Sequence, residues 1–78
     1  GPATLSAGEI SVIQRDVCRP WTVVTRELSP KDWDVCVFYG HRQEPEQRVI
    51  CQTRKLATMW HNRCLRKCRK ERDEQGKH

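Results

Sequence analysis

The sequence lacks several features on which common functional assignments rest. It contains no C-x-x-C pair and no glycine-rich phosphate loop, and only 4 of its 78 residues are glycine. No apolar run approaches the roughly 18 residues that a membrane-spanning helix needs, and the N-terminus has no basic start followed by an apolar stretch. These absences argue against a membrane protein, a nucleotide-dependent enzyme and a chain that carries a secretory signal.

Recognisable catalytic groupings are absent as well. The three histidines, His41, His61 and His78, have no nucleophile or carboxylate arranged around them in a known pattern. The sequence therefore predicts that the protein is not an enzyme and that it needs no cofactor.

Cysteine, in contrast, is frequent for so short a chain. The five cysteines are Cys18, Cys36, Cys51, Cys64 and Cys68. An odd number would leave one thiol over in a closed disulfide framework. The simplest interpretation is that they act as small buried apolar side chains.

Two other interpretations of the cysteines stay open. A zinc site could use His61, Cys64 and Cys68 on one helix stripe, with Cys36 or His41 as a fourth ligand. A small secreted ligand of the chemokine kind could use disulfide-bonded cysteines on its strands, followed by a basic helix. The sequence matches no standard zinc-binding spacing, so we expect that no metal is bound.

Charge is distributed unevenly along the chain. The protein carries 15 Lys+Arg against 10 Asp+Glu, a net charge of +5. Residues 54–70 contain seven basic residues and no acidic one, so the whole positive excess lies there. A basic segment without interleaved acids is typical of a surface that binds polyanions.

Local patterns predict the secondary structure. Residues 6–9 (Ser-Ala-Gly-Glu) form a capping box, which predicts a helix over 7–17 that ends before Pro20. The alternation of residues 33–39 predicts a strand. Trp33, Val35, Val37 and Tyr39 would lie on one face, with Asp34, Cys36 and Phe38 on the other. Strands are also predicted over 21–28 and 47–52, with a turn over 29–32 and a helix of roughly 15–18 residues that starts after Thr53.

These elements predict one small domain of the α+β class. The expected order is α-β-β-β-α, a three-stranded antiparallel sheet with two helices packed on one face. Residues 1–5 are expected to be a lead left by a cleaved tag, residues 6–70 the domain, and residues 71–78 a disordered charged tail.

Three short motifs, in this order, point to one known family. Residues 20–27 begin with Pro-Trp, where that family's first strand often begins Pro-x-Tyr, and residues 29–32 (Ser-Pro-Lys-Asp) stand at its Gly-Pro-x-His loop. Residues 53–57 (Thr-Arg-Lys-Leu-Ala) correspond to the Ser-Lys-Lys-x-Ala that opens its second helix. Over residues 6–67 the chain thus resembles the double-stranded RNA-binding domain.

That resemblance implies a function and a site. A-form duplexes are recognised by shape, through phosphates and 2′-hydroxyls, and the family contacts phosphates with the basic start of its second helix. The protein would then be a module of a larger RNA-processing or regulatory protein, intracellular, in the nucleus or cytoplasm. The implied RNA-binding residues are Glu9, Ser29, Lys31, Arg54, Lys55 and, at the place of the family's third lysine, Thr58.

Two alternative functions remain at this point. The same fold could serve as a protein-interaction or dimerisation module that uses its sheet or a helix face. The second alternative is the secreted, disulfide-bonded ligand.

Overall fold

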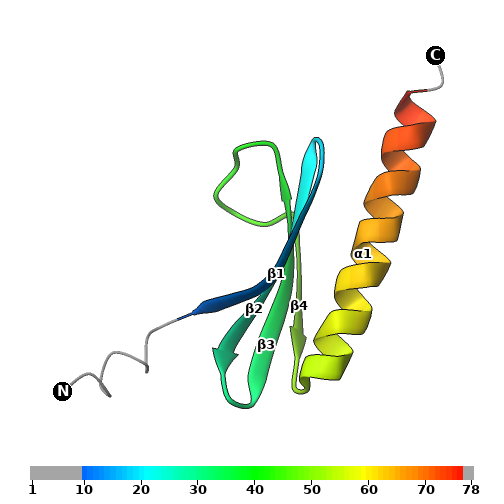
Figure 1. The fold of residues 1–78 in the computed structure, drawn as a ribbon. Helices are drawn as coiled ribbons and strands as arrows, with labels where there is room; N and C mark the ends of the chain where they lie inside the picture. Colours follow the sequence, from blue (N-terminus) through cyan, green and yellow to red (C-terminus); the bar gives the residue numbers. More distant parts are fainter. Residues whose placement is uncertain (1–9, 77–78) are drawn as a thin grey trace.

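The computed structural model describes residues 10–76, which form an antiparallel sheet and one long helix (Figure 1). The elements are β1 (Ser11–Cys18), β2 (Trp21–Ser29), β3 (Asp32–Tyr39), β4 (Gln47–Cys51) and α1 (Arg54–Gln75). The four strands are neighbours in sequence order, and every pair is antiparallel. The helix α1 covers one face of the sheet. The predicted α+β class and antiparallel sheet are therefore confirmed.

The predicted helix over 7–17 is wrong for its described part, because Ser11–Cys18 is strand β1. This segment pairs with β2 from Ser11 opposite Glu27 to Cys18 opposite Trp21, with a bulge between Val12 and Gln14. β-branched side chains are common in this segment and favour a strand once a neighbouring strand is available. The capping box at residues 6–9 lies outside the described residues. The described part therefore has four strands and one helix, not three strands and two helices.

The other three strands match the predicted segments 21–28, 33–39 and 47–52 to within one residue at each end. The turn between β2 and β3 is held by the hydroxyl of Ser29, which donates to Oδ2 of Asp32 at 3.0 Å and accepts from the backbone N–H of Lys31 at 3.2 Å. At the end of β3, Gly40 has a φ of 60°, a left-handed conformation that glycine adopts without a steric penalty. Its N–H donates to the carbonyl oxygen of Pro20 at 2.8 Å, which ties this corner to the β1–β2 turn.

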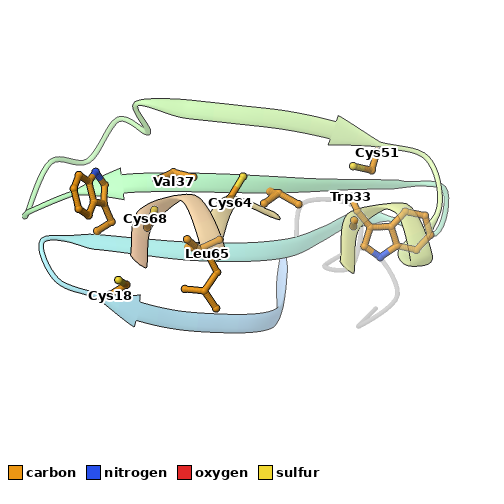
Figure 2. Close-up of a cluster of buried hydrophobic side chains, with 11 residues drawn as sticks. Cys18, Trp33, Val37, Cys51, Cys64, Leu65 and Cys68 are labelled. Atoms are coloured by element: carbon orange, nitrogen blue, oxygen red, sulfur yellow. The ribbon is translucent and has the colours of Figure 1, made fainter. Parts of the chain in front are cut away.

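The hydrophobic core lies between α1 and the sheet face that it covers (Figure 2). The helix contributes a stripe at helical spacing, and the sheet contributes alternate residues of its two central strands. The main contributors are Trp21, Val23, Trp33, Val35 and Val37 from the strands and Ala57, Cys64, Leu65 and Cys68 from α1. The indole N–H of Trp21 donates to Glu46 at 3.0 Å, so one of the two core tryptophans has a partner for its polar atom.

The helix α1 begins at a capped end and extends beyond the sheet. The hydroxyl of Thr53 accepts from the N–H of Leu56 at 3.1 Å, as an N-cap residue does. The helix continues to Gln75, through residues 71–75 where the sequence predicts a frayed tail. The last buried helix residue is Cys68, and the turns that follow project past the strands (Figure 1).

All five cysteines are free and buried. Four of them, Cys18, Cys51, Cys64 and Cys68, belong to the core between helix and sheet, and Cys36 lies on the opposite face of the sheet. Burial raises the pKa of the Cys36, Cys51 and Cys64 thiols and raises that of Cys68 to about 11. The folded protein therefore holds these groups as neutral thiols, which agrees with their interpretation as apolar packing residues.

These raised pKa values predict a loss of stability in alkali. A thiol whose pKa is higher in the folded state contributes fully below its ordinary value of about 9, and the contribution is lost as the pH rises toward its folded pKa. Urea unfolding under reducing conditions should therefore give a midpoint that falls between about pH 8 and about pH 10.5. The variant Cys68→Ala should be less stable at neutral pH, but its urea midpoint should fall by a smaller amount over the same pH interval. An equal alkaline loss in both proteins would contradict the assignment to Cys68.

Candidate nucleic-acid interface

The side of α1 that faces away from the sheet is strongly basic. Side chains on this side lie opposite the stripe formed by Ala57, Cys64 and Cys68, and the basic ones are exposed to solvent. We call this side the outer surface of α1. Its basic residues are Lys55, Arg63, Arg66 and Lys70, with Lys67 and Arg69 at its margins. Arg54 is exposed at the first residue of the helix, in line with the buried His61 and Cys68.

The charge of the outer surface is not neutralised within residues 10–76. The helical ion pair found in that range, Arg72 with Asp73, lies beyond the seven basic residues and involves none of them. Arg63 stacks over the ring of Trp60, with 4.9 Å from its guanidinium carbon to the ring centroid. The remaining cations are exposed to solvent, so their field extends outward from the helix.

The first turn of α1 also has features that favour anion binding. It contains no acidic residue, and Arg54 and Lys55 are both exposed there. Thr53 satisfies the N–H of Leu56 with its hydroxyl and that of Ala57, at 3.1 Å, with its carbonyl oxygen. The backbone N–H groups before Leu56 lie at the positive end of the helix dipole, where anions are favoured.

The structure brings several of the predicted RNA-binding residues to one end of the molecule. Because Cys51 at the end of β4 pairs with Trp33 at the start of β3, the β2–β3 turn and the start of α1 lie at the same end (Figure 1). Lys31 is exposed in that turn, whereas the hydroxyl of Ser29 is committed to holding the turn.

Two of the predicted RNA-binding residues, Thr58 and Glu9, lie elsewhere in the chain. Thr58 is exposed on the second turn of α1, beside the basic first turn. Glu9 lies outside the described residues. The candidate interface therefore combines the outer surface of α1 with the β2–β3 turn.

Sequence reasoning missed a buried polar chain between α1 and the sheet. His61, whose side chain is fully buried, bonds through Nδ1 with the hydroxyl of Thr25 at 2.8 Å and through Nε2 with Oδ2 of Asp16 at 2.7 Å. The bond with His61 and a second one from Gln14, at 3.0 Å, lower the pKa of the Asp16 carboxyl. A carboxylate therefore does accompany His61, in contrast to what the sequence indicates.

The burial of these hydrogen-bonded side chains argues for a structural role. Thr25 is 2% exposed and His61 is 0% exposed, so a substrate does not reach the hydroxyl or the imidazole. Both ring nitrogens of His61 are engaged, which leaves neither free to bind zinc. Within residues 10–76, no group of three or more His, Cys, Asp or Glu side chains is placed to hold a metal ion.

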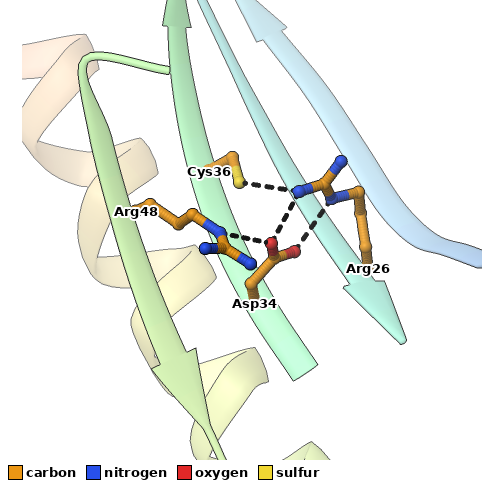
Figure 3. A network of polar contacts seen from close by, with 4 residues as sticks. All are labelled: Arg26, Asp34, Cys36 and Arg48. Carbon is orange, nitrogen blue, oxygen red and sulfur yellow. Dashed lines mark hydrogen bonds and ion pairs between the residues drawn. The ribbon is translucent and has the colours of Figure 1, made fainter. Parts of the chain in front are cut away.

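A second polar network lies on the sheet face away from α1, which we call the open face (Figure 3). Arg26 donates to Asp34 through Nε at 2.9 Å and Nη2 at 2.6 Å, and Arg48 donates through Nε at 2.8 Å. Arg26 also contacts the sulfur of Cys36 at 3.5 Å. Burial alone would raise the pKa of Asp34, but the hydrogen bonds from the two arginines outweigh it and lower that pKa. One carboxylate thus holds two guanidinium groups, which leaves a net positive charge.

The comparisons with known proteins do not assign the chain to a family. No family model, curated protein or solved structure matches it. Among the described helices, none is long and apolar enough to cross a membrane. Functional inference therefore rests on the residues and their geometry.

Proposed function

We propose that this domain binds double-stranded nucleic acid through the outer surface of α1 and the adjacent β2–β3 turn. The observation that carries the proposal is the row of exposed cations on α1, which have no acidic partners within residues 10–76. Such a surface is suited to a regular polyanion, because each neutralised phosphate releases bound counterions and strengthens binding. The domain would act as a binding module and not as an enzyme.

The length of the cationic row suits a duplex. From Lys55 to Lys70 the helix rises by about 22 Å at about 1.5 Å per residue. This length lets several cations contact successive phosphates of one duplex. The first turn of α1, with Arg54 and Lys55 beside open backbone N–H groups, provides a further phosphate contact.

Two forms of duplex share this phosphate chemistry. Strands β2 to β4 followed by α1 have the order of the three strands and second helix of the double-stranded RNA-binding domain, which favours RNA. Because β1 stands where that family has its first helix, the proposed contacts are limited to α1 and the turn. A helix also fits the roughly 12 Å major groove of B-form DNA, whereas the major groove of A-form RNA is narrow. A direct comparison of RNA with DNA therefore identifies the ligand.

The predicted result is salt-sensitive binding to a duplex of about 20 base pairs, longer than the roughly 16 that a complete RNA-binding domain spans. Fluorescence anisotropy at several salt concentrations should give micromolar or tighter affinity at low salt. Arg66→Glu/Lys70→Glu should weaken binding at least tenfold and reduce the magnitude of the salt slope by about 2. Arg54→Ala/Lys55→Ala should also weaken it.

Matched variants and duplexes make this result decisive. Arg15→Glu/Arg19→Glu changes the net charge equally, lies in and beside β1 away from α1, and should retain most of the affinity. Preference for RNA would support the family resemblance, and equal affinity would identify contacts with the phosphate backbone alone. Absence of binding to either duplex at low salt, or an equal loss in both charge-reversal variants, would refute the proposal.

A further inference from the structure

The open face combines exposed aliphatic side chains with arginines. Val12, Val17 and Ile50 are 58%, 51% and 51% exposed, although they lie on the strands of the sheet. In the cross-strand row between them, Arg15 pairs with Val24 and Arg48 pairs with Cys36. Apolar side chains that remain exposed on a regular sheet face, among cations, indicate a surface that another molecule covers.

A cleft opens at one end of this face, where the β1–β2 turn meets the chain that leaves β3. It has a volume of about 700 Å³. Arg15, Arg19 and His41 line it, together with Val17 and Thr22 of the open face, and no acidic residue lines it. The hydrogen bond between the N–H of Gly40 and the carbonyl oxygen of Pro20, at 2.8 Å, fixes the two segments that form its end. The cleft is thus a basic extension of a partly aliphatic surface.

The charges of the open face favour a negatively charged ligand. The carboxylate of the polar network on this face, Asp34, is fully buried and pairs with the guanidinium groups of Arg26 and Arg48. Arg15 forms no ion pair with any residue in the range 10–76, and the side chain of Arg48 is 48% exposed. The outward charge is therefore positive. A second copy of this chain would present a face of the same sign, so charge opposes self-association through it.

We propose that the open face and its cleft bind an acidic segment of a partner protein, with carboxylate side chains placed between aliphatic ones. The carboxylates pair with Arg15 and Arg19 in the cleft, and the aliphatic side chains cover Val12, Val17 and Ile50. A nucleic acid supplies the anions, but its phosphate backbone supplies no aliphatic groups for these residues. The chemistry of the face therefore favours an acidic peptide over a second nucleic-acid site.

The proposal is tested by selecting ligands from a display library of short random peptides on the intact protein. The selected sequences should be rich in Asp or Glu together with Leu, Ile or Val. A fluorescein-labelled selected peptide should bind at least tenfold more weakly to Arg15→Glu/Arg19→Glu and to Val17→Asp. In NMR spectra of the ¹⁵N-labelled protein, addition of the peptide should shift the backbone resonances of β1, the β1–β2 turn and residues 40–41.

Variants on the other side of the molecule separate this proposal from the nucleic-acid function. Arg66→Glu/Lys70→Glu carries the same charge change on α1 and should leave peptide affinity within twofold. The proposal fails if no peptide is selected, if the selected peptides are not acidic, or if the α1 variant loses binding equally. It also fails if the cleft variant loses duplex binding instead of peptide binding. Each surface can thus be refuted while the other stands.

Discussion

Replacing His61 with alanine is expected to lower the free energy of unfolding by about 3–4 kcal/mol. Its imidazole is fully buried between α1 and the sheet, so the substitution leaves a cavity. The substitution also removes both hydrogen bonds of His61 and leaves the hydroxyl of Thr25, a residue that is 2% exposed, without its partner. Asp16, whose side chain is 38% exposed, can turn to water and adds less to the loss.

Such a loss is large for a domain of this size. A chain of this length has a total stability of roughly 4–12 kcal/mol, so the variant is expected to be partly unfolded at the lower end of that range. Urea unfolding followed by circular dichroism measures the difference, with the slope against urea showing whether both proteins unfold in the same way. His41→Ala is the matched control, because His41 is exposed, and should change stability by less than about 0.5 kcal/mol.

The bond between Thr25 and His61 can be measured separately. Thr25→Val keeps the shape of the side chain and should cost about 1 kcal/mol. In the Thr25→Val background, the cost of His61→Ala should be smaller by about 1 kcal/mol, since the shared bond is already gone. If His61→Ala costs no more than His41→Ala, the buried chain does not stabilise the fold as described.

The helix could be predicted from the sequence because its signals are local. Thr53 caps its first turn, and Ala57, Cys64 and Cys68 recur at helical spacing on the buried side. The absence of acidic residues between Arg54 and Lys70 likewise needs no three-dimensional information. The outer surface of α1 is therefore visible in the sequence as an uninterrupted basic segment.

The first strand could not be predicted in the same way. A capping box at residues 6–9 argued for a helix, whereas the preference of Ser11–Cys18 for a strand depends on its partner β2. The sequence shows no carboxylate arranged around His61, because its partners Asp16 and Thr25 lie 45 and 36 positions away. No local sequence pattern connects residues so distant. The hydrogen bonds of His61 with Asp16 and Thr25 therefore follow only from the pairing of β1 with β2 beneath α1.

The open face could be predicted only in part. Alternation correctly places Asp34 and Cys36 on one face of β3 and Val35 on the other. It does not reveal that Arg26 and Arg48 reach the same carboxylate, because that follows from the pairing of β3 with both neighbouring strands. A buried acid in a predicted strand nevertheless signals that basic partners exist, since an isolated buried carboxylate is unfavourable.

Replacing Asp34 with asparagine should therefore cost about 2–3 kcal/mol at neutral pH. The amide keeps the shape of the side chain but removes the negative charge that faces two guanidinium groups, and its NH₂ group would point at an N–H donor. The cost stays below the roughly 3–5 kcal/mol of a fully buried pair, because Arg26 and Arg48 are 27% and 48% exposed and can be partly solvated. The control Asp73→Asn, which breaks the exposed pair with Arg72, should cost less than about 1 kcal/mol.

The pH dependence gives this prediction a second, independent readout. The pKa of Asp34 in the folded protein lies below its ordinary value of 3.8. Its contribution to stability is therefore complete above that value and is lost as the pH falls through the folded pKa. The difference in unfolding free energy between the original protein and Asp34→Asn should shrink in acid, while the Asp73→Asn difference stays small throughout. A difference that is the same at neutral pH and at about pH 2.5 would mean that shape, and not charge, makes Asp34 important.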